Sequence, residues 1–328
     1  MAIKTMLEAI REGMAEEMRR DERVIVLGED VGVAGGVFGA TIGLHAEFGE
    51  ERVIDTPLSE SSIVGVAIGA AFNDIRPIAE MQFADFIFPA MNQIVSEAAR
   101  IRYRSNGDFS CPIVIRAPYG GGVHGALYHS QSVEAIFHHV PGLKIVTPAT
   151  PYDAKGLLKA AVRDPDPVMF FEHKRTYRLI KGEVPEGDYV TPIGQAEVKR
   201  EGRDLTIISY GLMLHTVLEA AEALADDDDI SVEVVDLRTI KPLDKATILA
   251  SVRKTGKALI VHEDNLTGGV GAEVGAIIAE EAFDALDGPV RRLCAPDAPA
   301  MGFASTLEHA FMPDVAQVRE AILALAAY

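Results

Sequence analysis

A single carboxylate stands at the entrance to an apolar segment of the chain. The stretch Asp55-Thr-Pro-Leu-Ser-Glu60 is followed by residues 61–71, which carry no charged side chain and are mostly small or aliphatic. Burial of a carboxyl group raises its pKa, which makes Glu60 a candidate for acid–base chemistry near neutral pH. The alternative is a structural role, because acidic side chains are also favoured in the first turn of a helix.

A glycine-rich stretch carries the second candidate group. Residues 119–132 read Tyr-Gly-Gly-Gly-Val-His-Gly-Ala-Leu-Tyr-His-Ser-Gln-Ser and contain His124 and His129, with His138 and His139 downstream. A metal cluster is not favoured, because no carboxylate or cysteine lies at ligand spacing. A serine hydrolase is not favoured either, because the sequence has no G-x-S-x-G motif. An ordinary hydrogen-bonded histidine remains the alternative to a functional one.

Two further glycine-rich segments, 32–39 and 268–275, each follow a predicted strand. Neither has the Lys-Ser/Thr pair of a phosphate-binding P-loop. The second is only loosely similar to a dinucleotide-binding loop, so we interpret both as turns. A nicotinamide-dependent dehydrogenase that uses residues 268–275 is kept as an alternative.

Apolar periodicity predicts an α/β protein in which strands and helices alternate. Short buried strands are predicted at 24–27, 77–82, 113–116, 144–147, 168–172, 205–209, 232–237, 258–262 and 290–293. Helices are predicted at 59–73, 88–103, 152–163, 214–225, 243–254, 271–285 and 315–327. We expect two domains with mainly parallel sheets, 1–185 and 203–328, joined by a linker at 186–202. Sites in such folds lie beyond the carboxyl ends of strands, which selects the loops 28–38, 119–132 and 263–271.

Composition narrows the possible partners. The chain has 328 residues and a formal net charge of −18, which argues against nucleic acid and anionic membranes as partners. The longest apolar run, 63–72, is far shorter than the roughly 20 residues that a membrane span needs. Cys111 and Cys294 lie far apart and predict neither a disulfide framework nor a zinc site. The N-terminus runs directly into an amphipathic pattern, so we expect a cytoplasmic protein.

Several long motifs resemble one enzyme family. They include DTPLSE (55–60), AEMQFADFIFPAMNQ (79–93), GGGVHGALYHSQS (120–132) and VDLRTIKPLD (235–244). Together they resemble the β subunit of the E1 component of thiamine-diphosphate-dependent 2-oxo acid dehydrogenases, which has transketolase-like pyrimidine-binding and C-terminal domains. The stretches HGALYHSQS and FFEHKRTYRLIKGEVP (170–185) are most similar to the branched-chain 2-oxo acid type. Pyruvate and acetoin relatives share much of this pattern and remain the alternative.

The resemblance implies roles for particular residues. Glu60 matches the glutamate that bonds N1′ of the thiamine diphosphate aminopyrimidine. Leu58, Gln82 and Phe86 match positions that line the pyrimidine, and Phe86 stands where relatives often carry tyrosine. His129 matches the catalytic histidine, which is expected to steer protons while the acyl group passes to the lipoyl arm of E2.

The resemblance also implies ions and partners. A structural potassium ion would be held at Ile113, Ala161, Asp164 and Asp166, with a plain helix-ending turn as the alternative. The sequence has no Gly-Asp-Gly motif for the diphosphate and Mg²⁺, so an α subunit is expected to supply both in an α2β2 assembly. The C-terminal domain would support the dimer and contact E2. A non-catalytic scaffold subunit is the alternative from a different class.

Overall fold

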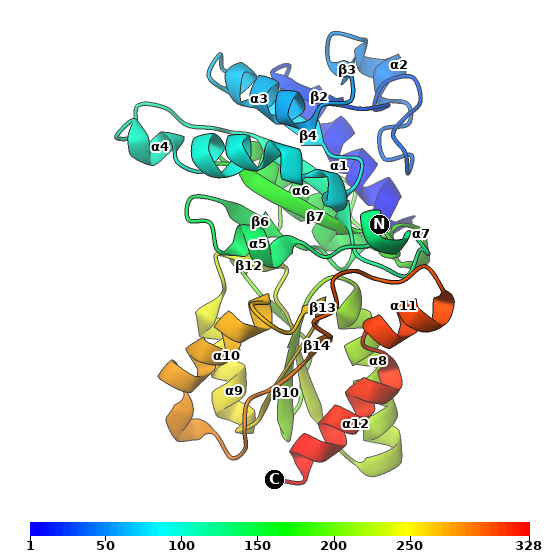
Figure 1. Cartoon of the computed structure of the whole chain (residues 1–328), viewed down its shortest axis with the longest axis vertical. Coiled ribbons are helices and arrows are strands. Elements are labelled where there is room, and N and C mark those ends of the chain that lie inside the picture. The colour runs from blue at the N-terminus through cyan, green and yellow to red at the C-terminus, as the bar shows by residue number, and fades with distance from the viewer. The chain divides into compact units, whose positions relative to one another are not determined.

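The chain folds around two sheets, each of which forms the centre of its own unit (Figure 1). The computed structural model describes residues 1–328. Unit 1 comprises Met1–Tyr119 and Ile136–Ile193, and unit 2 comprises Gly120–Ala135 and Gly194–Tyr328. The glycine-rich segment with both candidate histidines therefore belongs to unit 2, although it follows a strand of unit 1.

The strands of the main sheet in unit 1 run parallel in the order β6-β7-β5-β4-β2-β3. Their bounds are β2 (Val24–Gly28), β3 (Val53–Asp55), β4 (Arg76–Glu80), β5 (Val114–Tyr119), β6 (Lys144–Val146) and β7 (Val168–His173). A small antiparallel pair, β1 (Ala2–Thr5) with β8 (Lys181–Val184), completes the strands of unit 1.

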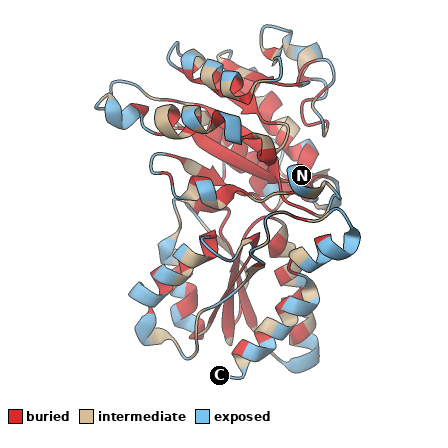
Figure 2. Cartoon of the chain, viewed as in Figure 1, coloured by how far each residue is buried: buried red, intermediate tan, exposed pale blue.

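Aliphatic residues on both faces of this sheet are buried, which is why its strands read as nearly continuous apolar runs (Figure 2). Helices α1 (Met6–Arg20) and α6 (Pro151–Arg163) pack against each other and share a core with one face of the sheet. Helix α3 (Glu60–Ala71) contacts β4 and the segment 88–98. The shorter helices are α2 (Leu44–Phe48), α4 (Ile101–Arg104), α5 (Glu134–His138), where the chain returns from unit 2, and α7 (Thr176–Leu179).

The predicted continuous helix at 88–103 is wrong. The structure has 3₁₀ turns at Ala84–Phe86 and Phe88–Ala90, a π-helix at Asn92–Ala98 and then α4. A π-helix carries more residues per turn than an α-helix, so it changes which side chains share a face. Apolar periodicity alone does not distinguish these helix types.

Unit 2 has a five-stranded sheet in the order β14-β13-β10-β11-β9, parallel except for the edge strand β9. Its strands are β9 (Glu197–Arg200), β10 (Leu205–Ser209), β11 (Val232–Asp236), β13 (Ala258–Asn265) and β14 (Arg291–Ala295), and β12 (Thr239–Lys241) follows β11 in the chain. Figure 1 shows α9 (Lys245–Thr255) and α10 (Val270–Glu281) on one side of this sheet and α8 (Leu212–Asp228) and α12 (Val315–Ala326) on the other. The remaining helices of unit 2 are α11 (Ser305–Phe311) and the 3₁₀ turns Ala126–Tyr128 and Phe283–Ala285.

The predicted fold class is confirmed, because both sheets are mainly parallel and are covered by helices. The chain passes finally into unit 2 between Ile193 and Gly194. None of the helices combines the length and the apolarity that crossing a membrane requires.

Candidate active site

Glu60 is the first residue of α3, and only 8% of it is exposed. Ser59 precedes the helix without capping it through its side chain; its hydroxyl instead donates to Ser62 Oγ at 3.0 Å. The carboxylate therefore lies at the positive end of the helix dipole, where negative charge is favoured. The sequence correctly placed Glu60 at a helix start and in buried surroundings.

A second carboxyl group, which the sequence reasoning missed, lies near Glu60. Glu29 directly follows β2 and is 9% exposed. Burial raises the pKa of Glu29, and the negative charge of Glu60 raises it further. The signal that could have found Glu29 is its position, an acidic residue at the carboxyl end of an apolar strand in a parallel sheet.

The loop that follows β4 carries Gln82 and Phe86. Gln82 Nε2 donates to Asp30 Oδ2 at 3.1 Å, so the ends of two neighbouring strands, β2 and β4, are tied together. The Phe86 ring packs against Phe83, with 5.4 Å between the ring centroids. Leu58, in contrast, is 78% exposed. The four candidate residues thus comprise a buried carboxyl group, an amide, an aromatic ring and an exposed leucine, all in unit 1.

A fully buried ion network lies below this loop. Arg116 on β5 donates to both carboxylate oxygens of Glu172, at 2.6 and 2.8 Å, and to Glu80 at the end of β4. Tyr177 donates its hydroxyl to Glu172 at 2.6 Å. Burial raises the pKa of Glu80, while the two carboxylates hold the pKa of Arg116 above its usual range. The network fixes the strand ends from which Gln82 and its neighbours extend.

His129 lies in unit 2 and is half-buried, directly after the 3₁₀ turn Ala126–Tyr128. His124 and Ala126 have φ angles of 56° and 54°, in the left-handed region that residues other than glycine rarely adopt. Such backbone costs of order 1–3 kcal/mol per residue and persists only where the surroundings hold it. The surroundings therefore hold this segment in one defined conformation, although its backbone is irregular.

Two buried acidic side chains, Glu134 and Asp264, lie near the C-terminal end of the His129 segment, residues 120–132. Glu134 is fully buried and accepts from the Tyr210 hydroxyl at 3.0 Å. Burial, and next the charge of Asp264, raise the pKa of Glu134 well above its ordinary value. Burial also raises the pKa of Asp264 to about 6. Both groups thus favour the protonated form more than exposed carboxyls do.

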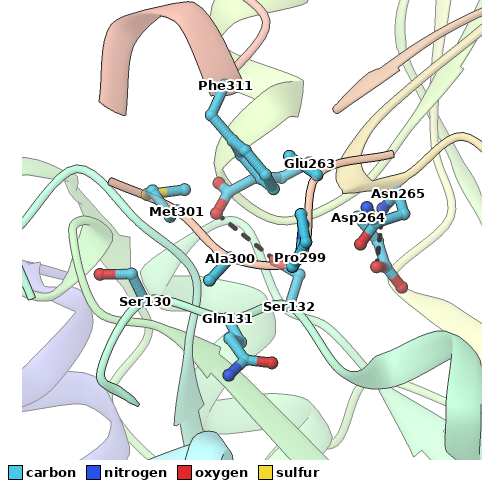
Figure 3. A pocket seen from close by; sticks show the side chains of 11 residues that line it. Ser130, Gln131, Ser132, Glu263, Asp264, Asn265, Pro299, Ala300, Met301 and Phe311 are labelled. Carbon is cyan, nitrogen blue, oxygen red and sulfur yellow. Dashed lines mark hydrogen bonds between the residues drawn. The ribbon is translucent and has the colours of Figure 1, made fainter. Parts of the chain in front are cut away.

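A small pocket lies between this segment and the strand β13 (Figure 3). Ser130, Gln131 and Ser132 line one side, and Glu263, Asp264 and the segment 298–301 line the rest. It encloses a volume of about 30 Å³, room for about two water molecules. The pocket is too small for an organic substrate, so we regard it as part of the packing of the His129 segment.

Gly269 and Gly271 allow close packing within unit 2. A Cβ at Gly271 would lie 2.8 Å from Nε2 of His262, and one at Gly269 would lie 2.6 Å from the same ring. Nε2 of His262 accepts from the Gly271 amide at 3.1 Å, and burial lowers the pKa of His262 to about 4. The interpretation of the whole segment 268–275 as a turn is wrong, because α10 begins at Val270 and contains Gly271 and Gly275.

The residues expected to hold potassium are bound to other protein groups. Lys144 Nζ lies 2.7 Å from both carboxylate oxygens of Asp164, and Arg102 binds Asp166. The carbonyls of Ile113 and Ala161 accept backbone amides at 3.0 and 3.2 Å. A lysine ammonium already neutralises Asp164, so these residues do not fit an additional cation well. Potassium binding stays a prediction.

Both halves of the chain match domains of known protein families. Residues 3–180 match the transketolase pyrimidine-binding domain, and residues 194–318 match the transketolase C-terminal domain. The chain is 65% identical to the 2-oxoisovalerate dehydrogenase subunit beta of Bacillus subtilis over 328 residues, which is the full length of both chains. It is 52% identical to the pyruvate dehydrogenase E1 component subunit beta of the same organism over 297 residues, covering 90% of this chain and 91% of that one.

The chain belongs to the family of 2-oxo acid dehydrogenase β subunits. A mitochondrial 2-oxoisovalerate dehydrogenase subunit beta from Dictyostelium discoideum is 49% identical over 310 residues, covering 94% of this chain and 83% of that one. Among solved structures, an inactive β4 tetramer of a split-gene transketolase matches with a TM-score of 0.80 at 24% identity, covering 98% of each chain. That likeness shows the transketolase-like fold of this β-subunit family member.

The sequence resemblance to this family is therefore confirmed. The structure places the predicted site residues in both units, with Leu58, Glu60, Gln82 and Phe86 in unit 1 and His129 in unit 2. Within unit 1, Glu60 lies near Glu29, while Gln82 is bound to Asp30. The roles of these residues stay predictions.

Proposed function

We propose that this chain is the β subunit of an E1 component that acts on branched-chain 2-oxo acids together with an α subunit. The complex would decarboxylate the 2-oxo acid and transfer the acyl group to lipoyl-E2. The observation that carries the proposal is the buried carboxylate of Glu60 at the start of α3, in a chain that belongs to this family. The 65% identity to a 2-oxoisovalerate dehydrogenase subunit favours branched-chain substrates.

Thiamine diphosphate is the proposed cofactor. When bound, it supplies a carbon that adds to the keto group and accepts the electrons released on decarboxylation. Glu60 would hold a proton at N1′ of the aminopyrimidine, a task for which a carboxyl group in a water-poor environment is suited. Leu58, Gln82 and Phe86 would line the same ring. The Phe86 ring retains stacking but lacks the hydroxyl contact that tyrosine would offer.

The α subunit would complete the site. The sequence contains no Gly-Asp-Gly motif, so we propose that the diphosphate and Mg²⁺ are bound by the α subunit in an α2β2 heterotetramer. His129 would move protons at the lipoyl sulfur and the acyl group during transfer to E2. We further propose that the assembly is cytoplasmic.

The experiment that tests the proposal is co-expression with the α subunit, followed by turnover assays with thiamine diphosphate, Mg²⁺ and an artificial electron acceptor. We expect faster turnover of 3-methyl-2-oxobutanoate than of pyruvate. A preference for pyruvate would support the second candidate, a pyruvate dehydrogenase E1 β subunit, which the 52% identity to such a protein favours. Activity on neither substrate would contradict the proposal.

A further inference from the structure

The segment 120–132 of unit 2 is an irregular loop whose base is closed by a backbone hydrogen bond. The amide of Gly120 donates to the carbonyl of Gln131 at 3.0 Å. Between these residues the backbone passes through the left-handed region at Gly122, His124 and Ala126. Since His124 and Ala126 carry side chains, groups outside the loop must hold this conformation.

A carboxylate from a distant part of unit 2 binds the first half of the loop. Glu308 Oε1 accepts from the amides of Gly122 and His124 at 2.9 and 3.0 Å. Its Oε2 lies 2.9 Å from His124 Nδ1. Glu308 is 1% exposed, whereas its neighbours Leu307 and His309 on α11 are exposed. One buried side chain thus binds three groups of the loop.

Two further carboxylates bind the loop and the residues that follow it. Glu263 Oε1 accepts from the amide of Gly121 at 2.6 Å and from the Ser132 hydroxyl at 3.4 Å, a contact drawn in Figure 3. Asp264 Oδ2 accepts from the amide of Ala135 at 3.3 Å. Hydrogen bonds in which the acceptor is ionised are about twice as strong as neutral ones. The loop is therefore anchored at both ends.

Close packing transmits this anchoring to His129. A Cβ at Gly125 would lie 2.7 Å from Cβ of His129, and one at Gly121 would lie 2.3 Å from Cε of Met301. Gly125 has a φ of −83°, which any residue adopts, so glycine is required there for space. A shift of the anchored residues 121–124 would displace the next residue, Gly125, which packs directly against His129.

We propose that Glu308, assisted by Glu263, is a positioning residue that fixes the loop 120–132 and thereby presents His129 for acyl transfer to the lipoyl group. The inference rests on the proposed role of His129. The carboxylate oxygens of Glu308 bind groups of the loop, so its removal should affect the step that needs His129 and spare decarboxylation.

The test compares Glu308→Ala, Glu308→Gln and the exposed neighbour variant His309→Ala in the assembled complex. Two rates are measured, reductive acylation of lipoyl-E2 and decarboxylation with an artificial acceptor, together with amide hydrogen exchange over residues 120–135. Loss of charged hydrogen bonds in Glu308→Ala should lower acylation about 10- to 100-fold and speed exchange in the loop. Decarboxylation should change by less than about twofold. Glu308→Gln, whose amide oxygen still accepts, should restore part of the acylation rate, and His309→Ala should match the wild type.

Unchanged exchange in Glu308→Ala would overturn the inference, and so would faster exchange without a loss of acylation. His129→Asn, measured in the same assays, distinguishes a failure of the proposed function from a failure of this inference. If His129→Asn does not lower acylation, the role of His129 is wrong and this inference falls with it. The exchange data require no turnover, so they distinguish a loop that Glu308 does not hold from a histidine that does not act.

Discussion

In unit 1 the candidate site residues stand at the ends of regular elements, whereas in unit 2 His129 stands on an irregular loop. Glu29 follows β2 and Glu60 begins α3, above a buried network in which Arg116 balances two carboxylates. The loop of His129 is held by carboxylates that bind backbone amides. The sheet orders the first region through its own hydrogen bonds, while the second depends on a few charged side chains.

The largest expected effect is a loss of stability when the buried cation of unit 1 is removed. Arg116→Met would leave Glu80 and Glu172 buried without their shared partner, which should lower the free energy of unfolding by about 3–5 kcal/mol. The measurement is urea unfolding of the isolated chain. The matched control is Arg104→Met, which removes a guanidinium that is 59% exposed and pairs with the exposed side chain of Glu97 at 2.9 Å. It should leave the unfolding midpoint unchanged. Equal effects of both variants would show that the buried network does not stabilise unit 1.

The second largest expected effect is the loss of catalysis in Glu60→Gln. The amide keeps the volume of the carboxyl group but cannot exchange a proton at the pyrimidine, so decarboxylation and acylation should both fall about 100- to 1000-fold, equal to about 3–4 kcal/mol in the barrier. Binding of thiamine diphosphate to the complex, followed by calorimetry, should weaken as well. Near-wild-type turnover by Glu60→Gln would refute the proposed mechanism. Loss of both reactions would contrast with Glu308→Ala, for which we expect loss of acylation alone.

The difference between the two regions also explains what the sequence could predict. The strand at 205–209 is found with the predicted bounds, and Glu60 stands at a helix start as expected, because both follow from local apolar periodicity. Glu308 lies 186 residues from Gly122, the residue whose amide it binds. Arg116 and Glu172 are separated by 56 residues. Such pairs arise from tertiary packing, which no local pattern records.

A third effect, of intermediate size, concerns pH and belongs to unit 2. Burial raises the pKa of Asp264 from 3.8 to about 6 in the folded chain. The folded state therefore binds this proton more tightly than the unfolded state between about pH 4 and pH 6, and stability contributed by Asp264 falls as the pH rises through that range. The fall amounts to about 2–3 kcal/mol.

The asparagine of Asp264→Asn cannot ionise. The decline in the free energy of unfolding between pH 4 and pH 6 should therefore be smaller by about 2–3 kcal/mol when unfolding is followed at several pH values. The exposed variant Asp226→Asn serves as the control and should keep the wild-type slope. An unaltered slope in Asp264→Asn would mean that the aspartate does not titrate in this range. Asp264 would then serve only as the acceptor for the amides of Ala135 and Asn265, and it would not make the pH sensitivity of the two regions differ.

The smallest expected effect concerns the outward face of α3 in unit 1. Gly65 and Gly69 lie four residues apart on α3, and a Cβ at Gly69 would meet no atom within 4 Å. Packing within the chain therefore does not require glycine at 69. Gly69→Ala should raise the free energy of unfolding of the isolated chain by about 0.5–1 kcal/mol, because alanine favours the helix. Thermal unfolding measures this gain, and destabilisation of the isolated chain would show that the space is not open. A stabilised chain that no longer assembles with its α subunit would locate a close approach of two chains at α3, and would show that the partner chain requires glycine at 69.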